Sequence, residues 1–255
     1  MGVQIMRDID EYPQHYDDSG RRNFLKLTST ATLLGFVGGA LFSDPVHADA
    51  LTKAQRKSMT PEQIIESMKR GNERFRKGES KARNYLREQR ASASGQYPAA
   101  VLLSCIDSRA PAEVIMDLGI GDIFNCRVAG NVENNDILGS MEFACKLAGA
   151  KVVLVMGHTK CGAVKGAIAN AELGHLTGLL AKIKPAVQAT TYTGDRSATN
   201  YDFVDAVARK NVELTIADIR KGSPVLAEME TQKKETIKIA GAMYNVTTGK
   251  VEFFG

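Results

Sequence analysis

The sequence has little of what nucleic-acid-binding, nucleotide-binding or membrane-spanning chains carry. Its 255 residues hold no run of five basic residues, and a net charge of +4 is a weak electrostatic footprint, so we expect no nucleic-acid partner. No Gly-x-Gly-x-x-Gly or P-loop pattern follows the first expected strand, which removes the main support for nucleotide binding. The mildly apolar stretch 27–42 is shorter than the roughly 20 residues that cross a bilayer. What remains, 44% apolar and 24% charged residues, is typical of a globular domain.

The first 48 residues predict an export signal. Paired Arg21 and Arg22, followed by an aliphatic residue and Lys26, resemble the twin-arginine consensus, and small residues up to Ala48 suit a signal-peptidase cut. We therefore expect a twin-arginine signal peptide over residues 1–48 and the twin-arginine translocase as a transient partner. Cleavage near Ala48 would leave a periplasmic or secreted protein. A short amphipathic anchor, or a helix of the folded domain, is the alternative for this stretch.

Residues 49–95 predict an N-terminal helical arm. Thr60 and Gln63 form a capping-box pattern at the start of its first helix, and residues 85–94 predict a second helix. The first helix has one apolar stripe, formed by Ile64, Ile65, Met68 and Phe75. Because later helices are expected to flank the sheet, this stripe has no obvious place in its own chain. We therefore expect self-association into a homodimer, a tetramer or another even-numbered oligomer.

Strand and helix patterns alternate over residues 96–255, which we assign to one α/β domain. This alternation predicts a central, mostly parallel sheet flanked by helices. A turn signal near 247–250 predicts a closing hairpin. The expected strands are 99–104, 122–127, 151–157, 238–246 and 251–254, and the expected helices are 111–117, 136–148, 161–172 and 201–221.

Two short stretches at strand ends carry metal-ligating side chains. Cys105 follows the first expected strand, and His158 and Cys161 follow the third. Because ligands bind at the carboxyl ends of the strands in an open α/β sheet, we expect these three side chains to converge there. Two thiolates and one imidazole match the ligand set of a catalytic Zn²⁺ site. Such a site binds one zinc per chain and leaves a fourth position for water or substrate.

Asp107 and Arg109 lie at alternate positions after Cys105, where an extended segment puts all three side chains on one face. An ion pair with Arg109 would keep Asp107 ionised. Asp107 then either orients a water molecule beside the metal or becomes the fourth zinc ligand and closes the site. The sequence leaves both roles open. Cys126 and Cys145 are expected to be small buried hydrophobes, with a disulfide between them as the alternative.

These motifs resemble those of the β-class carbonic anhydrases. The resemblance rests on Cys-x-Asp-x-Arg at 105–109 and His-x-x-Cys-Gly at 158–162, and it extends from about residue 96 to the carboxyl terminus. It implies reversible hydration of carbon dioxide to bicarbonate and a proton, with active sites at a dimer interface. The implied zinc ligands are Cys105, His158 and Cys161, and the implied orienting dyad is Asp107 with Arg109. The implied substrate contacts are Gln96, Phe124 and the amide of Gly162.

Two departures from the family pattern bear on the subgroup. Phe143 stands where many members have tyrosine, and the chain has no tryptophan, which the bicarbonate-inhibited subgroup uses in its regulatory pocket. We therefore expect a site that is open at neutral pH. Its activity should rise toward alkaline pH, because two thiolates offset the zinc charge. The alternatives are hydrolysis of carbonyl sulfide or carbon disulfide on the same scaffold, and a non-catalytic zinc-binding periplasmic protein.

Overall fold

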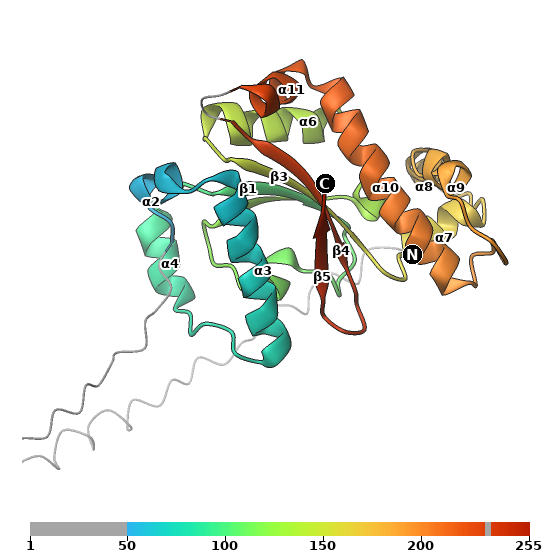
Figure 1. Cartoon of the computed structure of the whole chain (residues 1–255), viewed down its shortest axis with the longest axis horizontal. Coiled ribbons are helices and arrows are strands. Elements are labelled where there is room, and N and C mark those ends of the chain that lie inside the picture. The colour runs from blue at the N-terminus through green and yellow to red at the C-terminus, as the bar shows by residue number, and fades with distance from the viewer. Residues whose placement is uncertain (1–49, 233–235) are drawn as a thin grey trace, which may run out of the picture. The chain divides into compact units, whose positions relative to one another are not determined.

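A five-stranded sheet forms the centre of the computed structural model, which describes residues 50–232 and 236–255 (Figure 1). The strands are β1 (Ala100–Ser104), β2 (Ile123–Arg127), β3 (Val152–His158), β4 (Lys238–Tyr244) and β5 (Val251–Phe254). Their order is β2-β1-β3-β4-β5, and every pairing is parallel except that of β4 with β5. The predicted mostly parallel sheet with a closing hairpin is therefore confirmed. The predicted signal peptide, residues 1–48, lies outside the described residues.

The helices follow the predicted alternation, with additional short helices that the sequence pattern did not reveal. The described part of the chain contains α2 (Lys53–Ser58), α3 (Pro61–Lys77), α4 (Tyr85–Ser92), α5 (Ala112–Ile115), α6 (Asn135–Glu142), α7 (Gly162–Ile168), α8 (Gly174–Ala181), α9 (Lys184–Ala189), α10 (Tyr201–Gly222) and α11 (Pro224–Thr231). The unexpected ones are α2, α8, α9 and α11. The predicted helix 136–148 is not a continuous α-helix, because a π-helical turn, Phe143–Leu147, follows α6. Among these residues, no helix is both long and apolar enough to span a membrane.

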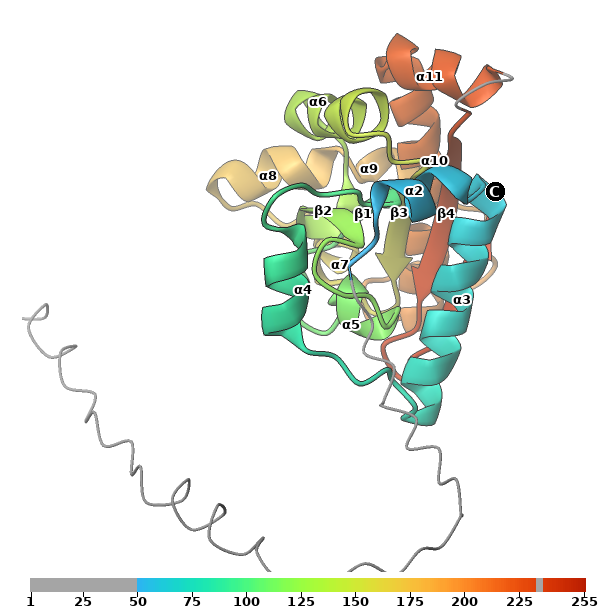
Figure 2. The same cartoon turned by 90° about the vertical axis from the view of Figure 1, so that its left-hand side faces the viewer.

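Different helices cover the two faces of the sheet (Figure 1, Figure 2). β1 and β3 are buried along their whole length. Because the side chains of a strand alternate between faces, β1 contributes to two cores. Val101 and Leu103 pack with residues of α6, α7 and α10, whereas Ala100 and Leu102 pack with residues of α3 and α5. Because both strands are packed along their whole length, the residues that follow β1 and β3 at their carboxyl ends are held in fixed positions.

The N-terminal arm packs on its own sheet, which corrects the expectation that its apolar stripe has no place there. The predicted capping box is present: the Thr60 hydroxyl accepts the Gln63 N–H at 3.2 Å, and Gln63 Oε1 accepts the Thr60 N–H at 2.9 Å. Ile64 and Met68 of α3 are each 2% exposed and pack in one core with Leu102. The stripe finds room because α6, α7 and α10 all contribute to the other core. The arm is therefore not itself evidence for a second subunit.

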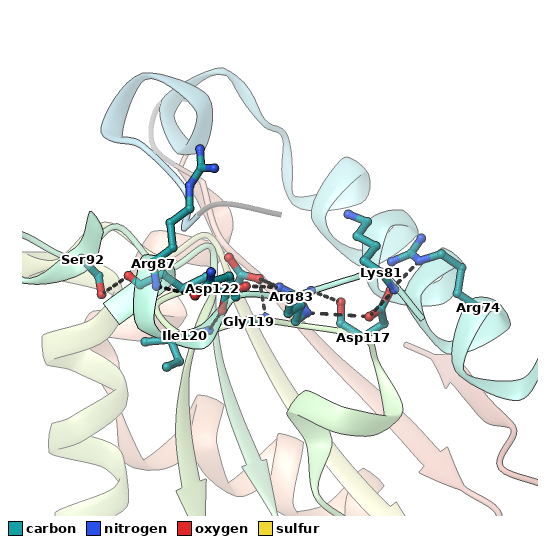
Figure 3. Close-up of polar contacts among 11 residues, drawn as sticks. Arg74, Lys81, Arg83, Arg87, Ser92, Asp117, Gly119, Ile120 and Asp122 are labelled. Carbon is teal, nitrogen blue, oxygen red and sulfur yellow. Dashed lines mark hydrogen bonds and ion pairs between the residues drawn. The ribbon is translucent and has the colours of Figure 1, made fainter. Parts of the chain in front are cut away.

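A network of buried ion pairs ties the arm to the loop after α5 (Figure 3). Arg83 Nη1 donates to Glu88 Oε1 at 3.1 Å, and Arg83 Nη2 donates to the Asp117 carbonyl at 2.5 Å. Glu88 Oε2 accepts the Ile120 N–H at 2.9 Å, and Arg74 Nε donates to Asp117 Oδ2 at 2.5 Å. The side chains of Arg83, Glu88 and Asp117 are at most 7% exposed. Because each buried charge has an opposite partner and further hydrogen bonds, the network fixes the link between α3 and α4.

Candidate metal centre

The three predicted ligands meet at the carboxyl ends of β1 and β3. Cys105 directly follows β1, His158 is the last residue of β3, and Cys161 precedes the first residue of α7. Their candidate ligand atoms all lie within 4.8 Å of one another. Each of the three residues is at most 4% exposed. The side chains therefore form a buried group in which one metal ion can contact all of them.

The His158 ring is oriented for metal binding. Its Nδ1 lies 2.9 Å from the Thr159 carbonyl oxygen and, as the protonated nitrogen, donates a hydrogen bond to it. Its Nε2 is buried and has no hydrogen-bond partner among the described residues. A buried polar atom without a partner is costly, and the backbone hydrogen bond on the other nitrogen is the usual arrangement of a metal-ligating histidine. Nε2 is therefore the His158 atom that a metal ion would bind.

The pKa values of the two thiols shift in opposite directions. The hydrogen bond with Cys161 lowers the pKa of Cys105 to about 4, with smaller contributions from His158 and from the Gly130 amide, whose N–H donates to Cys105 Sγ at 3.3 Å. The same hydrogen bond, together with burial and the charge of Cys105, raises the pKa of Cys161. Two adjacent thiolates repel each other, and a divalent cation removes that repulsion.

This ligand set fits one zinc ion. Two thiolates and an imidazole suit a borderline-soft metal, and zinc in catalytic sites takes three protein ligands and leaves a fourth position open. The described cluster contains these three ligands, and Asp107 lies outside it. The fit rests on the orphaned Nε2 of His158 and on the close approach of the two sulfur atoms.

Asp107 and Arg109 form a bidentate ion pair beside the cluster. Arg109 Nε donates to Asp107 Oδ1 at 2.9 Å, and Arg109 Nη2 donates to Oδ2 at 2.8 Å. The Arg109 backbone N–H adds a third hydrogen bond, to Oδ1 at 2.9 Å. Chiefly through its side-chain hydrogen bond, Arg109 lowers the pKa of Asp107 to about 2. Asp107 Oδ2 remains 3.8 Å from His158 Nε2, so the ionised carboxylate lies next to the ligand position.

The three predicted substrate contacts are not all near the cluster. Gly162 is the exposed first residue of α7, directly after Cys161, and a Cβ there would meet nothing within 4 Å. Gln96 is exposed and precedes β1, whereas Cys105 follows that strand. Phe124 lies within β2 and packs edge-to-face on Phe143, with 6.2 Å between ring centroids. Within one chain, only Gly162 is adjacent to the metal ligands, and the roles of Gln96 and Phe124 stay predictions.

Sequence reasoning missed a residue that fixes the backbone after β1. Arg127, the last residue of β2, donates from Nε to the Cys105 carbonyl at 2.9 Å and from Nη2 to the Asp107 carbonyl at 2.6 Å. Its place at the carboxyl end of a neighbouring strand was the available signal. The alternative disulfide is absent, since all four cysteines are free. Cys145 is buried as predicted, but Cys126 is only half-buried, because β2 is an edge strand.

A buried group of two cysteines and one histidine, with an ionised aspartate beside it, has the ligand set of the zinc hydrolases and hydratases. The carbonic anhydrase family model matches residues 100–251. Carbonic anhydrase 2 of Mycobacterium tuberculosis is 33% identical over 186 residues, which cover 72% of this chain and 88% of that protein. The carbonic anhydrase of Mycolicibacterium smegmatis is 33% identical over 188 residues, which cover 73% and 89%.

Solved structures agree with the sequence relatives. The β-carbonic anhydrase CafA of Aspergillus fumigatus is 27% identical and superposes with a TM-score of 0.56, covering 64% of this chain and 78% of that chain. A chain from the crystal structures of two tetrameric β-carbonic anhydrases of Sordaria macrospora matches at a TM-score of 0.56 and 24% identity, covering 64% of this chain and 83% of that chain, which supports the fold alone. The chain belongs to the carbonic anhydrase family, in its β class. It is an enzyme that interconverts carbon dioxide and bicarbonate, with zinc as cofactor.

Proposed function

We propose that the hydration of carbon dioxide occurs at the centre formed by Cys105, His158 and Cys161, with Asp107 and Arg109 as the orienting pair. The observation that carries this proposal is the ionised Asp107 carboxylate, paired through both oxygens with Arg109 and 3.8 Å from His158 Nε2. A site for zinc storage alone needs no such pair. Nothing in the described residues favours carbonyl sulfide or carbon disulfide as the substrate.

The residues of the chain divide the chemistry between them. Zinc bound by these ligands supplies Lewis acidity at its fourth position, which makes water there a better nucleophile. An ionised Asp107 can only accept hydrogen bonds, so it orients an O–H group at that position. Arg109 fixes the carboxylate rotamer and keeps the carboxylate ionised. Gly162 is at the start of α7, and a Cβ there would meet no atom within 4 Å, so a substrate can approach its backbone. The Gly162 N–H suits a hydrogen bond to a developing negative charge on that substrate.

The metal assignment is tested by replacing one ligand. We expect Cys161→Ser to lose most of its zinc and its hydration activity, because a serine hydroxyl is a poor zinc ligand. Cys126→Ser is the matched control, because Cys126 is a free thiol outside the cluster and should keep about one zinc per chain. Full zinc occupancy in purified Cys161→Ser, measured by metal analysis, would overturn the assignment.

We further propose that the chain self-associates through the β2 edge. Among the described residues β2 has no neighbour on its outer side, and apolar side chains are exposed near it. Phe143, in contact with Phe124 of β2, is 51% exposed. Ile106 and Val114 are 60% and 56% exposed, and each adjoins a residue, Cys105 or Glu113, that accepts a hydrogen bond from β2. Exposed apolar patches of this kind suit a subunit interface. A second copy at this edge would also explain how Gln96 and Phe124 serve a site that they do not reach within one chain.

Export through the twin-arginine route is the proposal for residues 1–48. It is supported by the Arg21–Arg22 pair and the small residues before the expected cut at Ala48. Replacing both arginines by lysine should retain the uncut precursor in the cytoplasm, while the native precursor yields a shortened periplasmic or secreted protein. Fractionation that finds the double variant still exported and cut near Ala48 would indicate the general secretory route instead.

A further inference from the structure

One helix, α10, hydrogen-bonds to both backbone segments that carry or contact the cysteine ligands. It packs against β3, β4 and α7, and its interior contributes Asn211 and Thr215 to the buried polar residues of the protein. Where α10 passes β3, a Cβ on Gly157 would lie 2.7 Å from the Val212 side chain, so helix and strand approach each other directly before His158. The helix is therefore a rigid support next to the metal centre.

The first contact is made by Asp205. Its Oδ1 accepts the backbone N–H of Lys160 at 2.7 Å. Lys160 lies between the ligands His158 and Cys161 and has a φ of 57°, a left-handed conformation that a residue with a Cβ rarely adopts. Such a conformation persists only where neighbouring groups stabilise it. The hydrogen bond from its N–H to Asp205 Oδ1 supplies that stabilisation and sets the direction in which Cys161 leaves the turn.

The second contact is made by Asn211. Its Nδ2 donates to the Gly130 carbonyl at 2.8 Å, and the Gly130 N–H in turn donates to Cys105 Sγ at 3.3 Å. Gly130 also has left-handed geometry, with a φ of 70°. Asn211 is 3% exposed among apolar neighbours such as Val207, Ala208 and Val212. A buried amide there is unfavourable unless it is paired, and its partner is the peptide that contacts the thiolate.

We propose that Asp205 and Asn211 are positioning residues for the metal centre: Asp205 fixes the His158–Cys161 turn, and Asn211 fixes the Gly130 amide against Cys105. Neither touches the metal or the substrate. The inference rests on the proposed metal assignment, and it adds to it the groups that hold the two cysteine ligands in place. Groups that orient metal ligands in this way commonly change metal affinity by about tenfold to a hundredfold when removed.

The test is the rate at which the zinc-loaded protein releases zinc to a chromophoric chelator. We expect Asp205→Ala and Asn211→Leu each to release zinc about tenfold faster or more, because the ligand turns lose a fixed anchor. The visible absorption of the cobalt-substituted variants should also shift, since it reports the geometry of the thiolate ligands. Asp205→Asn retains an acceptor oxygen at the same place and should restore native behaviour. Asp218→Ala, an exposed aspartate on the same helix, is the matched control and should match the native protein.

A native release rate and a native cobalt spectrum in Asp205→Ala would overturn the proposal for Asp205, and the same result in Asn211→Leu would overturn it for Asn211. An Asp205→Asn variant as impaired as Asp205→Ala would also contradict the hydrogen-bond role. If Asp205→Ala does not fold, Asp205→Ser is judged by the same criteria, because its shorter hydroxyl does not reach Lys160. A native protein that binds no zinc would instead contradict the metal assignment itself, so the two failures are distinguishable.

Discussion

The shape and the charge of the Asp107 side chain can be tested separately. Its carboxylate accepts three hydrogen bonds from Arg109, two from the guanidinium and one from the backbone. An asparagine has nearly the same shape, but it carries no charge for Arg109 to pair with and presents one acceptor oxygen instead of two. Replacing Asp107 by asparagine therefore shows whether activity depends on the charge of the carboxylate or only on the shape of the side chain.

We expect Asp107→Asn to keep its zinc and to lose hydration activity by about tenfold to thousandfold, or roughly 1.4–4 kcal/mol at the transition state, because orientation of the attacking group is lost. Zinc content and kcat/KM are measured on the same preparation, with Asp218→Asn as a surface control. A rate near the native one would contradict the orienting role. Loss of zinc would show that Asp107 is a structural ligand, and it would reverse the expectation of an open site.

The pH dependence of the rate should not reflect Asp107. Because Arg109 depresses its pKa to about 2, the carboxylate is ionised at neutral pH, and the ion pair is lost only as the pH falls through that value. From neutral to alkaline pH the charge of Asp107 therefore stays unchanged, whereas a zinc ion held by two thiolates would have its charge offset and would acidify water less than one held by neutral ligands. We expect kcat/KM of the native enzyme to rise toward alkaline pH. A profile that is flat from neutral to alkaline pH would contradict this account.

At the scale of the elements, the arm depends on buried charges as well as on its apolar stripe. In Figure 3, Arg83 of the arm extends toward Asp117 in the loop after α5. Arg83 pairs with Glu88 and donates to the Asp117 carbonyl. Glu88 is 1% exposed, so removal of Arg83 would take away the guanidinium that neutralises this buried carboxylate and would leave it the Ile120 N–H hydrogen bond. By contrast, Arg70 and Glu66 on the exposed side of α3 pair at 3.7 Å with more than half of each side chain in solvent.

Arg83→Met should destabilise the protein by about 3–5 kcal/mol, because it removes the cation of a buried ion pair and leaves the Glu88 carboxylate buried. Arg70→Met removes an exposed pair and should cost less than about 1 kcal/mol. Chemical denaturation of both zinc-loaded variants measures the difference. Equal free energies of unfolding for the two variants would show that the network in Figure 3 contributes no more than a surface contact.

The sequence predicted those features that depend on local pattern and missed those that depend on packing. The capping box of α3 and the strand-end positions of Cys105, His158 and Cys161 are local, and all of them appear in the structure. The site of the arm was missed because the face on which each helix lies is set by the whole topology. Arg127, Asp205 and Asn211 were missed because their partners lie 20, 45 and 81 residues away in the chain. Strand register and helix rotation bring these groups together, and neither is readable from spacing.

The β2 edge and its exposed apolar neighbours favour assembly of the protein into an even-numbered oligomer. We expect the protein to sediment as a dimer or larger species at micromolar concentration, and Phe143→Asp to shift it toward monomer, because a charge would be buried in the interface. Leu173→Asp is the control: Leu173 is 71% exposed and precedes α8, which is neither β2 nor the π-helical turn that contains Phe143. A native protein that is a monodisperse monomer would contradict the proposed interface.

The proposed zinc centre at the ends of β1 and β3 can be tested directly through the hydration of carbon dioxide. Stopped-flow measurement of proton release, with zinc-loaded protein that begins after Ala48, tests it most directly when native protein and Cys161→Ser are compared in the same buffer. We expect rapid hydration by the native protein, faster at alkaline than at neutral pH, and only the uncatalysed rate with Cys161→Ser. A native protein that holds one zinc per chain and yet does not exceed the uncatalysed rate at either pH would contradict it.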